Sequence, residues 1–229
     1  MALAGKALVA IWNDIAPEMR EDFFEWHPRE HMVERLGVPG FLRGRRCVAI
    51  DAAVEFLTLY ELAGPQVLVS EIYKTRLNNP TPWSTKTLPH FRNNVRGACR
   101  IHFTDGVAMG GILHTTRLRA QEGRERELID ALRREVMPAL SPMPRITGAH
   151  LVENDESLTA GNAGNQRGRV ILLPHLVVLV EGSTVAGVKK AVGELLDPQR
   201  LQTMGARAEI DQGLYQLEYS IQALAGAAA

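Results

Sequence analysis

Apolar and polar residues alternate along the chain in a way that predicts strands and amphipathic helices in a repeated order. Residues 8–15 form a β-rich run, and Pro17 then opens a helical stretch, because proline is tolerated in the first turn of a helix. Met19, Phe23 and Trp26 follow at intervals of three and four residues, which places them on one helix face. We therefore expect a strand followed by a helix.

The rest of the first half continues with two strands, a helix and a last strand. Residues 41–50 and 55–62 are β-rich and close enough to pair as a hairpin. A second helix is predicted at 66–77, followed by a loop rich in Asn, Pro and Thr at 78–85. Residues 95–103 alternate between apolar and polar and predict the fourth strand.

The second half repeats this order. Its helix at 124–137 is amphipathic, and Ser183 or Thr184 can cap a later helix. A Gly/Asn-rich segment between its middle strands predicts a mobile surface loop, and the Ala-rich end predicts a frayed tail. The expected strands are 112–119, 146–152, 170–180 and 215–221, the loop is 159–168 and the tail is 223–229.

Two β-α-β-β-α-β runs in series predict an α+β protein of two tandem ferredoxin-like units. We place the boundary between residues 1–108 and 109–229, and the candidate site in the first unit. Each antiparallel sheet has helices on one face, so the other face needs a cover. Packing the two sheets together into an α+β barrel supplies it, and the similar order of elements suggests a tandem duplication.

Composition restricts the function. Apolar residues make up 45% of the chain and charged residues 23%, so it can bury a core. It has 26 basic and 26 acidic residues, which argues against nucleic acid or an anionic membrane as a partner. Cys47 and Cys99 are too isolated for a disulfide framework or zinc ribbon and are expected to be buried free thiols. With no signal peptide or membrane span evident, we expect a cytoplasmic protein.

The chemically suggestive residues are concentrated in the first unit. Residues 23–31 read FFEWHPREH, and residues 38–46 follow closely with VPGFLRGRR. The corresponding helix of the second unit carries an ordinary amphipathic face at 127–136. The fold itself therefore does not require histidine and tryptophan at this place, and this asymmetry is the main argument for a site.

His27 and His31 match the H-x-x-E-H pattern, in which two histidines bind zinc beside a catalytic glutamate. A catalytic zinc also needs a third protein ligand, and no downstream acidic segment clearly supplies one. Pro28 disfavours helical geometry at His27, which would break the alignment of the two imidazoles. We therefore predict no metal site and no cofactor, and keep the His-Glu-His site only as a weaker alternative.

The segment 24–46, with its Trp/His/Glu-His residues and its Pro39-Gly40 turn into a strand, resembles the EthD-like family of the dimeric α+β barrel superfamily. The resemblance implies ferredoxin-like units whose sheets pair into a barrel, with a pocket between helices and sheet. It also implies a role in the oxidative degradation of small hydrophobic compounds, often without a cofactor. For this chain it implies a pocket lined by Trp26, His27 and His31.

His27 and His31 are the candidate catalytic residues, because an imidazole exchanges protons near neutral pH. The alternative is that both are partly buried helix residues with ordinary hydrogen bonds. Aromatic pocket walls and core aromatics look alike in sequence, and Arg43 suits a carboxylate or a salt bridge. The candidate ligand-binding residues are Trp12, Asn13, Phe23, Trp26, Arg43 and Trp83.

The sequence therefore predicts a protein that binds a small, largely apolar molecule in a first-unit pocket, with acid/base chemistry by a histidine as an open question. An enzyme of this kind would be a cofactor-independent oxygenase, isomerase or decarboxylase. The alternatives are a non-catalytic ligand-binding protein and a structural or assembly protein, whose core would be filled beside Trp26. A homodimer is the default oligomeric state for such folds.

Overall fold

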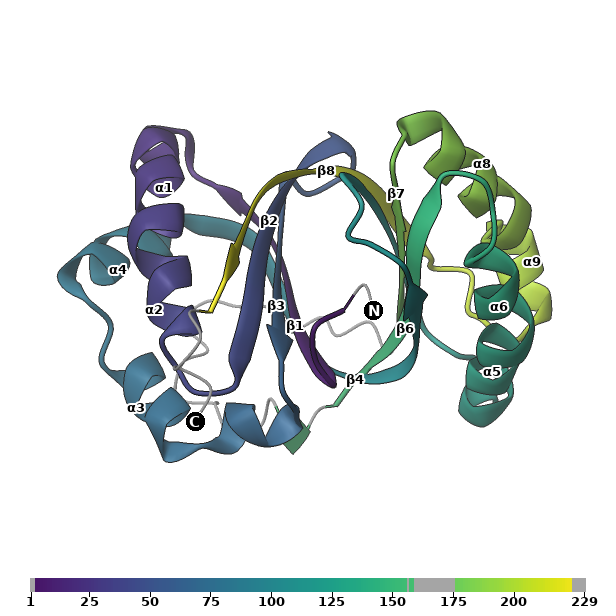
Figure 1. Ribbon diagram of the computed structural model, residues 1–229, viewed down its shortest axis with the longest axis horizontal. Helices are drawn as coiled ribbons and strands as arrows, with labels where there is room; N and C mark the ends of the chain where they lie inside the picture. Colours follow the sequence, from purple (N-terminus) through teal and green to yellow (C-terminus); the bar gives the residue numbers. More distant parts are fainter. Residues whose placement is uncertain (1–2, 156, 159–175, 224–229) are drawn as a thin grey trace.

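The computed structural model describes residues 3–155, 157–158 and 176–223 (Figure 1). The predicted loop at 159–168, the start of the predicted strand 170–180 and nearly all of the predicted tail lie outside these residues.

Both halves of the chain have the predicted β-α-β-β-α-β order. The elements of the first half are β1 (Ala7–Ile15), η1 (Pro17–Met19), α1 (Arg20–Trp26), η2 (His27–His31), α2 (Met32–Leu36), β2 (Phe41–Asp51), β3 (Phe56–Leu62), η3 (Pro65–Val69), α3 (Glu71–Asn78), α4 (Pro82–Thr87), η4 (Leu88–His90) and β4 (Phe91–Gly106). Those of the second half are β5 (Ile112–Leu118), α5 (Glu125–Ala131), η5 (Leu132–Val136), α6 (Met137–Leu140), β6 (Ile146–Asn154), β7 (Leu176–Gly182), α8 (Val185–Leu195), α9 (Pro198–Thr203) and β8 (Asp211–Gln222).

The strands form a closed barrel in the order β1-β3-β2-β8-β5-β7-β6-β4. Two antiparallel seams join the halves: β2 pairs with β8, and β4 pairs with β6. The helices of the two halves cover opposite outer sides of the barrel (Figure 1). The predicted fold, two tandem ferredoxin-like units whose antiparallel sheets form an α+β barrel, is confirmed. Closure also pairs edge strands that would otherwise be exposed.

Apolar side chains from both units fill the barrel interior, among them Leu8, Leu57 and Leu179. Cys47 and Cys99 belong to this interior cluster as buried free thiols, as predicted. Burial raises the pKa of both thiols to about 12. They are therefore protonated core residues near neutral pH and poor nucleophiles.

A buried ion cluster ties the two units together. The Arg45 Nε atom lies 3.0 Å from Glu61 Oε1, and Arg45 Nη1 lies 2.8 Å from Glu181 Oε1. Burial raises the pKa of Glu181, but the Arg45 charge and other contacts outweigh it and lower the pKa to about 2. The backbone N–H of Ala4 donates to Glu61 and that of Gly110 donates to Glu181. The buried carboxylates thus keep the partners that their burial requires.

The first long helix of each unit contains a π-helical turn at the same place: η2 lies between α1 and α2, and η5 lies between α5 and α6. His27 has φ −64° and ψ −48°, so the expectation that Pro28 would disrupt helical geometry at His27 was wrong. Pro28 lies near the start of the turn, and the Met32 N–H bonds to the His27 carbonyl across the wider π interval. His27 and His31 therefore lie where the second unit has Leu132 and Val136.

The segment after β3 differs from the prediction in two ways. The helix predicted at 66–77 is broken, because Ser70 is extended and its hydroxyl accepts the Tyr73 N–H, which starts α3 at Glu71. The segment predicted as a loop at 78–85 contains the start of α4, which has Pro82 in its first turn and Thr81 as its cap. In the second unit, the predicted cap at Thr184 is confirmed. Within the described part of the chain, no helix is long and apolar enough to cross a membrane.

Candidate functional site

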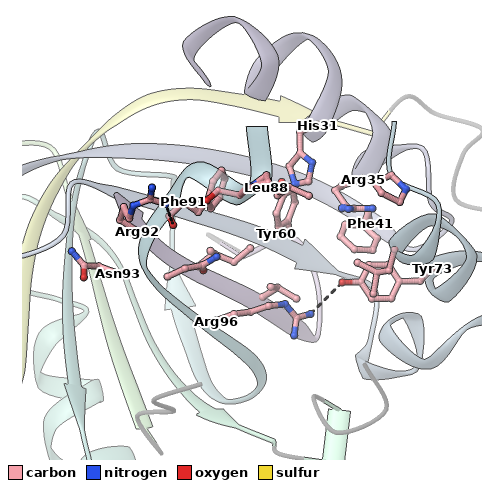
Figure 2. Close-up of a pocket in the computed structure, with 16 residues that line it drawn as sticks. His31, Arg35, Phe41, Tyr60, Tyr73, Leu88, Phe91, Arg92, Asn93 and Arg96 are labelled. Atoms are coloured by element: carbon pink, nitrogen blue, oxygen red, sulfur yellow. Dashed lines mark hydrogen bonds between the residues drawn. The ribbon is translucent and has the colours of Figure 1, made fainter. Parts of the chain in front are cut away.

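A cavity of about 540 Å³ lies between the helices and the sheet of the first unit (Figure 2). This size is in the range of small-molecule sites. Its lining residues are Val9, Ile11, His31, Arg35, Phe41, Tyr60, Tyr73, Leu77, Pro80, Leu88, Pro89, Phe91, Arg92, Asn93, Asn94 and Arg96.

The floor of the cavity is the outer face of the sheet. Val9 and Ile11 alternate along β1 with residues that point into the barrel, so they face the helices instead. Tyr60 comes from β3, next to Val9 in the strand register. Leu88 and Pro89 follow α4 and lie among the lining residues. Pro80, in the segment that the sequence predicts as a loop at 78–85, is a lining residue as well.

His31 is the only one of the predicted site residues among those that line the cavity. It is buried, and its ring packs against Trp26 with centroids 4.4 Å apart and an interplanar angle of 31°. Trp26 is fully buried in a cluster with Phe23 and Phe56. The immediate surroundings of Trp26 are thus packed, and the open space begins one helical turn further on, at His31.

His27 lies behind His31, with ring centroids 5.6 Å apart. Its Nδ1 shares a 2.5 Å hydrogen bond with the Tyr219 hydroxyl, and its Nε2 lies 3.4 Å from Thr58 Oγ1. Burial, with a smaller contribution from the Arg46 charge, holds the pKa of His27 well below its ordinary value. His27 is therefore neutral near pH 7, and its position is fixed by a tyrosine from the last strand.

The His-Glu-His motif does not converge on one point. The Glu30 Oε1 atom accepts hydrogen bonds from Trp26 Nε1 at 3.2 Å and from Thr81 Oγ1 at 2.5 Å. Glu30 thereby links the helix to the cap of α4. Among the described residues, no group of three or more His, Cys, Asp or Glu side chains could hold a metal ion.

One end of the cavity is polar and cationic. Tyr60 is 2% exposed, and its hydroxyl has no hydrogen-bond partner among the described residues. Burial raises the pKa of Tyr60, although the nearby Arg35 charge opposes this, so the phenol is protonated near neutral pH. The Arg96 Nη2 donates to the Tyr73 hydroxyl at 3.2 Å. An unsatisfied buried hydroxyl costs about 1–3 kcal/mol, so it marks a place where a ligand atom would be favoured.

The other predicted ligand-binding residues lie away from the cavity lining. Trp12 is buried in the barrel interior, and Asn13 is buried beside it on β1, where its Nδ2 donates to the Asp14 carbonyl. Arg43 forms an ion pair with Glu61 at 2.7 Å. Ligand contact by these residues stays a prediction.

Phe23 and Trp83 belong to the packed region at the end of the first helix. Phe23 is fully buried, and Trp83 is half-buried against the same cluster. The Trp83 Nε1 donates to Asp22 Oδ2 at 3.1 Å and so anchors α4 to α1. Contact of Trp83 with a ligand stays a prediction.

Sequence reasoning missed Arg35, Tyr60, Tyr73 and Arg96 as lining residues. Only weak signals pointed to them. Arg96 extends an alternating strand, and Arg35 lies one helical turn after His31. These four residues come together because three strands and two helices meet at the cavity, and no local sequence pattern encodes this arrangement.

Fold and cavity together define the class: a single-chain α+β barrel of two ferredoxin-like units, with a cavity between the helices and sheet of the first. No protein-family model matches the chain, and no curated protein matches it.

Solved structures share the whole fold. An anthrone oxidase-like protein is 12% identical, with a TM-score of 0.65, and the match covers 98% of this chain and 97% of that one. A Fusobacterium nucleatum protein provisionally described as a monooxygenase is 7% identical, with a TM-score of 0.62 and 96% of each chain covered. A similarly described Lactobacillus acidophilus protein is 8% identical, with a TM-score of 0.59 and 95% and 96% covered. At such identities the likeness establishes the fold alone.

Proposed function

We propose that the protein binds a compact, largely apolar small molecule in the first-unit cavity, and that His31 exchanges a proton with it. The observation that carries this proposal is the 540 Å³ cavity, which has aliphatic and aromatic walls and an imidazole in its lining. Concave sites with mostly apolar walls and a few polar groups are the usual form of small-molecule sites.

The sequence resemblance and the fold comparisons agree with this proposal at a general level. The EthD-like resemblance implies degradation of small hydrophobic compounds, and structural neighbours are described as an anthrone oxidase-like protein and, provisionally, as monooxygenases. Such agreement is an analogy between folds. The residues of the cavity are the stronger support.

Binding can be tested with N-phenyl-1-naphthylamine, a neutral probe whose fluorescence rises in apolar surroundings. We expect wild-type protein to bind it and Leu88→Trp, which fills part of the cavity, to weaken binding by about tenfold or more, or about 1.4 kcal/mol. Leu195→Trp is the matched control, because Leu195 is a half-buried leucine against the core of the second unit. Equal binding by both variants, or no binding by wild type, would contradict the proposal.

Proton exchange needs its own test, because a binding protein need not be an enzyme. 2-Tetralone is a neutral bicyclic ketone whose acidic C–H groups exchange in D2O, which NMR follows directly. We expect wild-type protein to accelerate this exchange by about 10²- to 10⁴-fold. His31→Val, which introduces the residue found at the equivalent position of the second unit, should abolish the acceleration while probe binding remains.

His27 provides the comparison for His31. Since His27 does not line the cavity and its lowered pKa makes it a weak base, His27→Leu should reduce the exchange less than His31→Val does. A larger loss in His27→Leu would assign the proton transfer to His27. No acceleration by wild type would leave the protein as a ligand-binding module.

The domain boundary and the homodimer remain proposals. The boundary after residue 108 falls between the end of β4 at Gly106 and the start of β5 at Ile112. Because one chain closes the barrel by itself, a homodimer would have to use another surface, such as the outer helix faces.

A further inference from the structure

We infer that the cavity is selective for an anionic ligand, and that Arg35, Arg96 and the Tyr60 hydroxyl form a subsite for its carboxylate. This inference rests on the proposed function and narrows it: among compact, largely apolar ligands, the cavity prefers small aromatic or alicyclic carboxylic acids to neutral compounds of the same shape.

Charge is the first argument. Among the residues that the structure describes, three arginines line the cavity and no aspartate or glutamate does. Glu34 lies next to Arg35 in the chain, but its carboxylate is close to Arg76, with Oε1 and Nη1 3.6 Å apart. A cavity with apolar walls, cationic side chains and no carboxylate among its described lining residues favours an anion, because pairing with an anion compensates the hydration that a guanidinium loses on burial.

Unsatisfied hydrogen-bonding atoms are the second argument. The Arg35 Nη1 and the Tyr60 hydroxyl are buried, and neither has a hydrogen-bond partner among the described residues. Figure 2 shows Arg35, Phe41 and Tyr73 together at one end of the cavity, with the Arg96 guanidinium directed toward Tyr73. A guanidinium and a protonated phenol are hydrogen-bond donors, and a carboxylate offers two acceptor oxygens to them.

The third arginine, Arg92, lies elsewhere. It precedes Arg96 by four residues on β4, which is roughly 13 Å along a strand. Its Nη1 donates to the carbonyls of Pro89 and Phe91. Arg92 also contributes to lowering the pKa of Glu18, although a backbone hydrogen bond and His90 contribute more. Arg92 is therefore a cavity arginine whose hydrogen bonds and charge are engaged elsewhere, which makes it a matched control.

The experiment compares 1-naphthoate with 1-naphthamide, two compounds of nearly the same shape that differ in charge, by isothermal titration calorimetry. We expect wild-type protein to bind 1-naphthoate about ten- to a hundredfold more tightly than 1-naphthamide. This ratio corresponds to the contribution of one or two charge-assisted hydrogen bonds. Arg35→Gln and Arg96→Gln should each lower the affinity for 1-naphthoate by about tenfold, and Tyr60→Phe should lower it by a smaller factor. Arg92→Gln should leave the preference intact.

Binding of 1-naphthamide reports whether each variant keeps its fold and its cavity. If wild type binds both compounds equally well, or if Arg92→Gln loses as much of the preference as Arg35→Gln, the carboxylate subsite is refuted while the proposed function stands. If wild type binds neither compound, the proposed function fails and the subsite fails with it.

Discussion

The two units have the same topology, but the space between helices and sheet is filled in one unit and open in the other. In the second unit, helices α5, α6 and α8 cover the sheet with buried aliphatic side chains such as Leu128, Leu140 and Val188. In the first unit, the corresponding helices carry His31 and Arg35, and the cavity lies between these helices and the sheet. The comparison shows that this scaffold tolerates either a filled core or a cavity at the same place.

The second helix of each unit accounts for part of the difference. α8 buries Val188, Ala191 and Val192 against its sheet, whereas α3 buries only Tyr73 among its described residues. A helix with a single buried ring cannot fill the space that three aliphatic side chains occupy. The few buried apolar side chains of α3 therefore account for part of the cavity.

Buried histidines lie in different layers of the two units, on the helix in the first and on the sheet in the second. The strand registers make Val9 of β1 equivalent to His114 of β5, because Leu8 pairs with Glu61 and Leu113 pairs with Glu181. In the first unit the helix supplies the imidazoles, and β1 supplies the aliphatic side chains Val9 and Ile11. In the second unit the sheet supplies the imidazole under an aliphatic helix layer. Only the first arrangement directs a histidine toward open space.

The largest effect that tests this comparison concerns packing. Leu132→Ala removes a fully buried side chain from the core of the second unit and should lower the free energy of unfolding by about 2–5 kcal/mol. Leu88→Ala, at a half-buried position already facing a cavity, should cost about 1 kcal/mol or less. Urea unfolding of both variants gives the two values. Similar losses would mean that the two faces are equally well packed.

A smaller effect concerns pH. Burial lowers the pKa of His114 to about 4, although the Asp51 charge opposes this shift. In the unfolded state the same imidazole has a pKa of about 6.5, so between these two pH values only the unfolded state is protonated at His114. Stability should therefore fall as the pH drops from about 6.5 toward 4, by on the order of 2 kcal/mol at pH 5. His114→Val, which introduces the first unit's residue, should reduce this fall. His27 acts in the same direction, so part of it remains.

Urea unfolding at pH 7.5 and pH 5 measures the difference, and wild type is the reference at each pH. If His114→Val shows the same loss of stability at pH 5 as wild type, His114 is not buried in its neutral form.

Several features of the site were accessible from local pattern. The helix face of Met19, Phe23 and Trp26 was evident from spacing and is buried as expected. The histidines at 27 and 31 drew attention to the helix that borders the cavity, and its functional role stays a prediction. Pattern could not place Tyr219 against His27, because these residues are 192 positions apart.

Other features were misjudged for identifiable physical reasons. The proline rule predicted a break at His27, but His27 keeps helical dihedral angles and a π-helical turn begins there, as it does at the same place in the second unit. The helix from residue 66 was predicted from apolar content, whereas the Ser70 hydroxyl sets the start at Glu71. Trp26 was predicted as a ligand-binding residue; it is buried in a packed cluster, and its contact with a ligand stays a prediction.

The amino-acid sequence by itself determined the order of strands and helices, the two ferredoxin-like units and the clustering of imidazoles, because periodicity, turns and caps act between neighbours in the chain. Tertiary structure alone decided which side chains face the cavity. That outcome depends on how completely α3, the π-helical turn and three strands fill the space between them, and such packing is set by contacts between residues far apart in the chain.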